Sequence, residues 1–149
     1  MGQQQLLLLV LGIVIVGLAV VVGIQAFGEN QKKANADAIT NDVIRIASDA
    51  QAWTLKPQAF GGGNGEFTGI EFQKLGYEAE GNGAGAVYSN LNANPDTGGD
   101  GSGFTLSGVG AETVTITGCN AETGNQVVAT VTGTSSDEIS TVQSNVDGC

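Results

Sequence analysis

Few side chains in this 149-residue sequence have the type and spacing needed for chemistry. It contains no histidine, which excludes a Ser-His-Asp relay, a histidine base and a histidine-ligated zinc site. Two cysteines are too few for a zinc site built from four thiolates. No nucleophile has a base beside it in the sequence. Four acids lie close together in sequence, but without the spacing of a catalytic pair: Glu66, Glu71, Glu78 and Glu80. We therefore predict no enzyme activity, no catalytic residue and no cofactor.

The two cysteines, Cys119 and Cys149, have two interpretations. A disulfide between them would close a loop of about 30 residues and, on the chain-entropy model, stabilise the fold by roughly 3–4 kcal/mol. The alternative is a pair of free thiols in a reducing compartment. We favour the disulfide, because the membrane-type segment described below points to an oxidising compartment.

Two glycine-rich segments superficially resemble ligand loops. The segment Asn92–Gly103 carries oxygen ligands suited to calcium at Asn92, Asn94, Asp96 and Asp100. Pro95 breaks the usual calcium-loop pattern and no glutamate stands at its twelfth position, so we expect a solvated loop and no metal. The run Gly61–Gly65 follows a predicted helix and lacks the Lys-Ser/Thr ending of a phosphate loop, which favours a linker.

The first structural element predicted along the chain is a very apolar segment, Leu6–Ile24, which has no polar side chain. A helix of that length spans the roughly 30 Å hydrocarbon core of a bilayer. No charged residue precedes Glu29, so the basic n-region of a secretory signal peptide is missing. We expect residues 1–28 to form a permanent membrane-spanning or protein-packing helix.

The next segment, residues 29–57, keeps a helical period but becomes amphipathic. Apolar residues spaced three and four apart form a narrow stripe that we expect to pack on the rest of the protein: Ala36, Ile39, Val43, Ile46, Ala50 and Trp53. The other faces of this helix are polar and charged. No proline interrupts the helix before Pro57, where it should stop.

Residues 58–149 have a different composition, rich in glycine, Ser, Thr, Asn and β-branched residues, which favours short strands and tight turns. The alternation of Thr113–Thr117 is typical of a strand with one buried face, and Asn120–Asn125 is typical of a hairpin loop. We predict strands near Phe67–Phe72, Ala86–Leu91, Gly103–Val109, Thr113–Thr117, Gln126–Thr132 and Glu138–Val142.

The expected fold class is therefore α+β, with a long N-terminal helix packed against a small antiparallel β-sheet head. Charge follows the same division. Residues 1–56 hold four basic and four acidic side chains, whereas residues 57–149 hold one lysine and eleven acids. An acidic head disfavours binding to nucleic acid and is typical of a surface-exposed domain.

A long helix that is hydrophobic first and amphipathic after, followed by a β-rich head with two cysteines, resembles type IV pilins and related pilin-like proteins. The resemblance runs over most of the chain and is strongest in residues 1–56. The region bounded by Cys119 and Cys149 looks like the disulfide-bounded C-terminal region of bacterial pilins. Two features depart from the family. Gln5 stands where, counting from Met1, a glutamate is usual, and the basic leader ending in glycine is missing, with Gly2 the only candidate for its last residue. The helix-bending proline of bacterial pilins is also absent, and Gly12, Gly17 and Gly23 could substitute for it.

The resemblance implies a structural subunit that polymerises with identical subunits into an extracellular, type IV pilus-like filament. The subunit would be held in a cytoplasmic-type membrane first and would then meet a filament assembly machinery. Gln3, Gln4 and Gln5 are the expected register-setting polar groups. The alternative is a membrane-anchored minor pilin or secretion-system pseudopilin with an extracytoplasmic binding head. The expected polymer-core residues are Leu6, Leu9, Gly12, Ile13, Val16, Gly17, Val20, Gly23 and Ile24.

Overall fold

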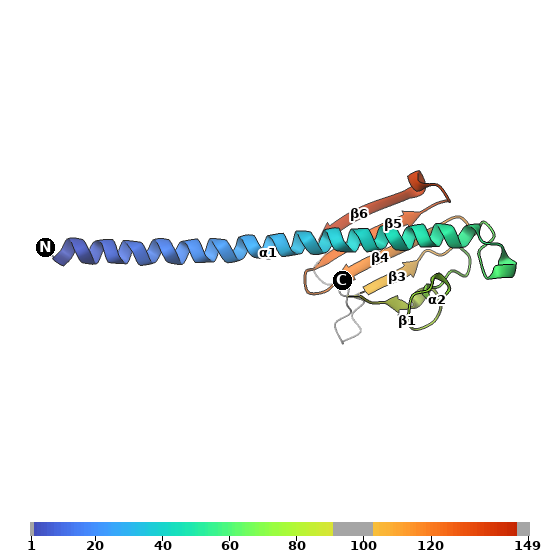
Figure 1. Ribbon diagram of the computed structural model, residues 1–149, viewed down its shortest axis with the longest axis horizontal. Coiled ribbons are helices and arrows are strands. Elements are labelled where there is room, and N and C mark those ends of the chain that lie inside the picture. Colours follow the sequence, from blue (N-terminus) through green and yellow to red (C-terminus); the bar gives the residue numbers. More distant parts are fainter. Residues whose placement is uncertain (1, 91–102, 146–149) are drawn as a thin grey trace. The chain divides into compact units, whose positions relative to one another are not determined.

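The computed structural model describes residues 2–90 and 103–145. The fold is α+β, with one long helix, α1, over Gly2–Leu55 and a six-stranded antiparallel sheet (Figure 1). The chain forms two compact units, residues 1–34 and residues 35–149. The first unit consists of helix alone, and the second contains the last part of α1 and the whole sheet.

Helix α1 ends where the sequence predicts. Its last residue, Leu55, lies two positions before Pro57, which cannot continue a helix and restricts the residue before it. The chain then turns back over the end of the helix through a short 3-10 helix, η1 (Gln58–Phe60). Amides of this loop donate to the last helical carbonyls, Gly63 N to Trp53 O at 3.1 Å and Gly65 N to Thr54 O at 2.7 Å. These bonds satisfy groups that a helix end leaves without partners.

The sheet is a meander in which each strand pairs with the next in sequence, in the order β1-β2-β3-β4-β5-β6. The two longest pairings have seven residue pairs each and join β5 to both of its neighbours. One runs from Val114 opposite Val131 to Asn120 opposite Asn125, and the other from Asn125 opposite Asn145 to Val131 opposite Ile139. The strands are β1 (Ala79–Glu80), β2 (Val87–Tyr88), β3 (Gly103–Ser107), β4 (Val114–Asn120), β5 (Asn125–Val131) and β6 (Ile139–Asn145). The short helix α2 (Phe72–Leu75) precedes β1, η2 (Gly83–Gly85) lies between β1 and β2, and η3 (Ser136–Glu138) lies between β5 and β6.

The sequence predicted β3, β4, β5 and β6 to within a few residues, and the hairpin loop between β4 and β5. The strand predicted at Phe67–Phe72 is wrong: this segment is a loop that leads into α2. Phe67, Ile70 and Phe72 are all buried, so their apolar character reflects packing and not strand alternation. Gly69, at a φ of +79°, breaks the extended backbone between them. Strand β1 was not predicted, and β2 is shorter than predicted.

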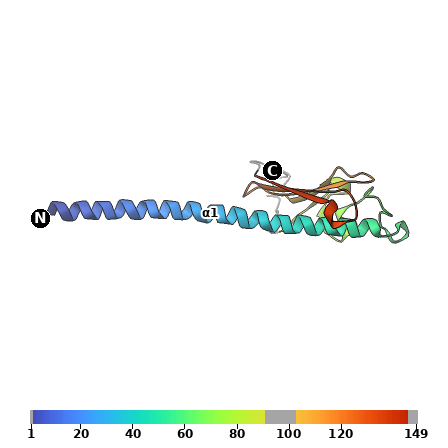
Figure 2. The ribbon, with the colours of Figure 1, turned by 90° about the horizontal axis from the view of Figure 1, so that it is seen from above.

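The core lies between residues 35–55 of α1 and one face of the sheet, which Figure 2 shows edge-on. Residues of β4 and β5 alternate between buried and half-buried, so that one face packs on the helix. The other face, which looks away from the helix, carries mainly Thr, Ser and Val. The buried apolar side chains of β3 to β5 are Phe104, Leu106, Val114, Ile116, Val127, Ala129 and Val131.

Candidate functional site

The apolar part of α1 is the most unusual surface of the protein. All fifteen Leu, Ile and Val side chains of Leu6–Ile24 are between 51% and 70% exposed. Each large apolar side chain gains about 1.5–3 kcal/mol when it leaves water, so a surface of this size is unstable in water. The helix is long and apolar enough to cross a membrane, and its apolar segment is compatible with membrane insertion.

The predicted polymer-core residues lie within this exposed segment. The large ones, Leu6, Leu9, Ile13, Val16, Val20 and Ile24, are all exposed, as are Gln3, Gln4 and Gln5 before them. Gly12 and Gly17 are exposed and Gly23 is half-buried. A Cβ atom added at any of these three glycines would meet no heavy atom within 4 Å, leaving out the backbone of the helix itself. Nothing inside the single described chain therefore requires glycine at these positions.

The predicted head-packing stripe lies against the sheet. Ile39, Val43, Ile46, Ala50 and Trp53 are each at most 5% exposed and belong to the core cluster. The buried face of the helix is wider than this stripe, since Ala47, Gln51 and Thr54 are buried as well. Sequence periodicity did not indicate Gln51 and Thr54, because both are polar.

Polar contacts along one side of the core attach α1 to the head. The Thr123 hydroxyl and the Asn125 amide both donate to Asn35 Oδ1, at 2.8 and 3.3 Å. Near the C-terminal end of α1, Gln51 Nε2 donates to the carbonyl oxygens of Gly133 and Ser135, both at 2.8 Å. These partners are more than eighty residues apart in sequence, so no local pattern could have indicated them.

Tyr77 forms a second link between the head and α1. Its hydroxyl donates to Asp49 Oδ2 at 2.5 Å, and the Arg45 guanidinium lies 5.6 Å from the centre of its ring. Burial, and then the hydrogen bond to Asp49, raise the pKa of Tyr77 to about 12. The ring of Tyr77 also packs against Tyr88, 4.8 Å between centres. This aromatic cluster fixes the segment that follows α2.

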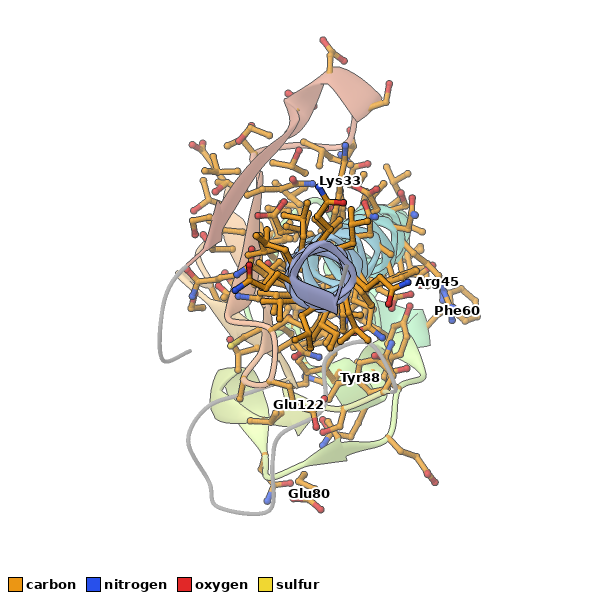
Figure 3. All side chains as sticks on the ribbon, turned by 90° about the vertical axis from the view of Figure 1, so that its left-hand side faces the viewer. Lys33, Arg45, Phe60, Glu80, Tyr88 and Glu122 are labelled. Atoms are coloured by element: carbon orange, nitrogen blue, oxygen red, sulfur yellow. The ribbon has the colours of Figure 1, made fainter. Side chains whose placement is uncertain are left out.

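The acidic residues near positions 66–80 do not form a paired site. Glu71 lies 3.7 Å from the Lys74 ammonium group, in an exposed i,i+3 pair. Glu80 points away from the head (Figure 3) and is exposed. Within the described ranges, no three acidic or cysteine side chains are grouped so that they could hold a metal ion. These described acids contribute negative charge to the surface of the head.

Two predictions fall at least partly outside the described residues. Cys119 is buried at 2% exposure on β4, whereas its predicted partner Cys149 is not described, so the disulfide stays a prediction. The segment Asn92–Gly103, interpreted above as a solvated loop, is described only at Gly103.

Comparison with known proteins identifies no relative of this chain, so the function is inferred from the sequence and the structure. No protein-family model, no curated protein and no solved structure matches the chain.

Proposed function

We propose that this protein is a structural subunit that polymerises through its N-terminal hydrophobic helix into an extracellular, type IV pilus-like filament. The observation that carries the proposal is the exposure of every Leu, Ile and Val side chain in Leu6–Ile24, on a chain whose other unit has a complete core. A helix of this kind requires lipid or other helices around it.

Assembly would transfer the same apolar surface from one environment to another. In the membrane, Leu6–Ile24 lies in lipid, and in the filament it packs against the same segment of other subunits. Lipid is as apolar as leucine, so close van der Waals contact would drive this step, with glycines allowing helices to approach. Each subunit would use one surface to meet a different surface of the next, which generates an open helical polymer.

The charges support a polymer with the heads outside. Residues 57–149 hold one lysine against eleven acids, while Gly2–Gly28 holds no charged residue. A neutral helix can enter a water-free core, and an acidic surface stays hydrated. Gln3, Gln4 and Gln5 would then need hydrogen-bond partners on neighbouring subunits, which would set the register between them.

The second candidate is a single-span membrane protein with an extracytoplasmic binding head, such as a minor pilin or pseudopilin. It is favoured by the same helix, because its length and composition also suit a permanent membrane anchor. The two functions differ in what the apolar segment contacts once the protein is mature: other copies of itself, or lipid.

Reconstitution of the full-length chain distinguishes the filament subunit from the membrane-anchored protein. The chain, purified in detergent, should form thin filaments when detergent is removed without lipid. Ile13→Glu, which places a charge in the proposed core, should abolish the filaments. Ile44→Glu is the matched control, since Ile44 is 41% exposed on the same helix but lies outside the apolar segment. A wild-type chain that enters added vesicles but never forms filaments would support the anchor.

A further inference from the structure

Strand β6 (Ile139–Asn145) is a long edge of the sheet. It is the last strand in the sheet order, and β5 is its neighbour through all seven residues. In a sheet, the edge strand presents a row of backbone N–H and C=O groups on the side away from its neighbour. The opposite edge, β1, has only two residues, one of which is Glu80.

The side chains of β6 are far more exposed than those of the inner strands. Residues 140–144 are all exposed, although successive side chains point to opposite faces, and Val142 is 63% exposed. One side-chain contact joins β6 to the helix, from Gln143 Nε2 to the Thr40 hydroxyl at 2.6 Å. Ile139, at the start of the strand, packs against the core, and beyond it β6 is held mainly by its backbone pairing with β5.

Soluble proteins usually protect an edge strand of this length. They place a lysine, a proline or another charged residue on it, or shorten it. Strand β1 shows two of these devices, while the sequence of β6, ISTVQSN, contains no charge and no proline. An uncharged, exposed edge strand that includes β-branched residues, here Ile139, Thr141 and Val142, is a template for another strand.

Charge indicates which partner fits this edge. The head carries eleven acids and one lysine, so two copies repel each other wherever acidic surfaces meet. Strands β3 to β6 contain no charged residue, and the two acids that directly precede β6, Asp137 and Glu138, lie in η3. Two β6 strands can therefore pair without placing an acid of one strand opposite an acid of the other. Strand length favours a second β6 as the partner, because it can pair with all seven residues of β6, whereas β1 can pair with only two.

We propose that β6 pairs antiparallel with β6 of a second copy of this chain, which joins two six-stranded sheets into one. In the centred register, Val142 lies opposite Val142 of the second copy, and Ser140 lies opposite Ser144. Val142 is also opposite Val128 of β5 within its own sheet, so the pairing continues an apolar cross-strand row. This contact uses the head alone and does not depend on the apolar helix.

The test uses the full-length chain in detergent micelles, where sedimentation equilibrium measures the dissociation constant of the dimer. Val142→Lys would place two like charges opposite each other at the centre of the pairing, and should weaken the dimer about tenfold or more. Val142→Thr keeps the edge uncharged and should retain it. Thr134→Lys adds the same charge at an exposed turn outside the strand and should also retain it.

Hydrogen exchange of the β6 amides gives the second readout. In the wild type, exchange should slow as protein concentration rises, and in Val142→Lys it should not. A wild type that is monomeric at every concentration, or a dimer that Val142→Lys leaves intact, would overturn the proposal. Protection of β6 without a dimer of this chain would overturn it too, and would show a different partner. If Val142→Lys loses the dimer but still forms filaments, polymerisation through the helix does not require the β6 contact. If the wild type forms the β6 dimer but no filaments, the β6 contact is supported and the filament proposal is not.

Discussion

Gly118 of β4 lies directly beneath Ile39 of α1: a Cβ atom added at Gly118 would lie 2.8 Å from Ile39 Cγ2. The same atom would lie 2.8 Å from Phe104 Cε1 and 2.9 Å from Val43 Cγ2. Helix and strand therefore approach more closely here than any side chain would allow. This contact sets the separation between the residue 35–55 part of α1 and the sheet.

Gly118→Val should destabilise the head by about 1–3 kcal/mol or more, because overpacking forces the helix away from the strand. Denaturant unfolding of the full-length chain in detergent measures the loss. Gly110→Ala is the matched control, since its added atom would come no nearer than 3.8 Å to its neighbours. Equal unfolding free energies for Gly118→Val and the wild type would show that the close approach is not needed.

The stability of the head should fall in alkaline solution. The folded pKa of Tyr77, about 12, lies above the ordinary value of 10.0 for tyrosine, so the Tyr77 contribution is fully present below pH 10. That contribution is lost as the pH rises from 10 to 12, because folding holds Tyr77 in the neutral form. Unfolding free energies at about pH 8, 10 and 11 should decline less steeply in Tyr77→Phe than in the wild type. Parallel declines would assign the alkaline loss to other groups.

Cys119 and Cys149 should be joined in the mature protein. Intact-mass measurement with and without reductant should differ by two hydrogen atoms. Cys149→Ser should lower the unfolding free energy by roughly 3–4 kcal/mol under oxidising conditions. Under reducing conditions the variant and the wild type should unfold alike. Two alkylated thiols in unreduced, denatured protein would contradict the bridge.

Substitutions of the helix glycines have opposite expected effects on the isolated helix, which alanine stabilises, and on a filament whose helices approach closely at glycine. Gly17→Ala favours helix formation by roughly 0.5–1 kcal/mol and meets no heavy atom within 4 Å in the single chain. A filament in which neighbouring helices approach at Gly17 should nevertheless dissociate at a lower temperature. Gly28→Ala, beyond the apolar segment, should leave the dissociation temperature unchanged. A more stable Gly17→Ala filament would argue against close helix contact at this residue.

Elements with regular periodicity were predictable from the sequence. The α1 stripe from Ile39 to Trp53 and the alternation in Thr113–Thr117 each follow from one repeating geometry, and Pro57 marks the end of the helix. The segment from Phe67 to Phe72 was not predictable, because its buried aromatic residues pack from an irregular loop. Burial is a property of tertiary contacts, and composition alone cannot distinguish a buried loop from a buried strand.

The residues that join helix and head were also beyond sequence reasoning. Asn35, Gln51 and Asp49 are ordinary polar residues on an amphipathic helix until the fold brings Thr123, Gly133 and Tyr77 to them. The exposed surface of Leu6–Ile24 is different. Its unbroken apolar composition is enough by itself to indicate that this segment needs lipid or protein partners.

The most direct test of the filament proposal is electron microscopy of material sheared from the cell surface, with the subunit identified by mass spectrometry. The proposal predicts thin filaments composed mainly of this chain. Recovery of the chain only from detergent-extracted membranes, with none in the sheared fraction, would contradict it and assign Leu6–Ile24 to a membrane anchor.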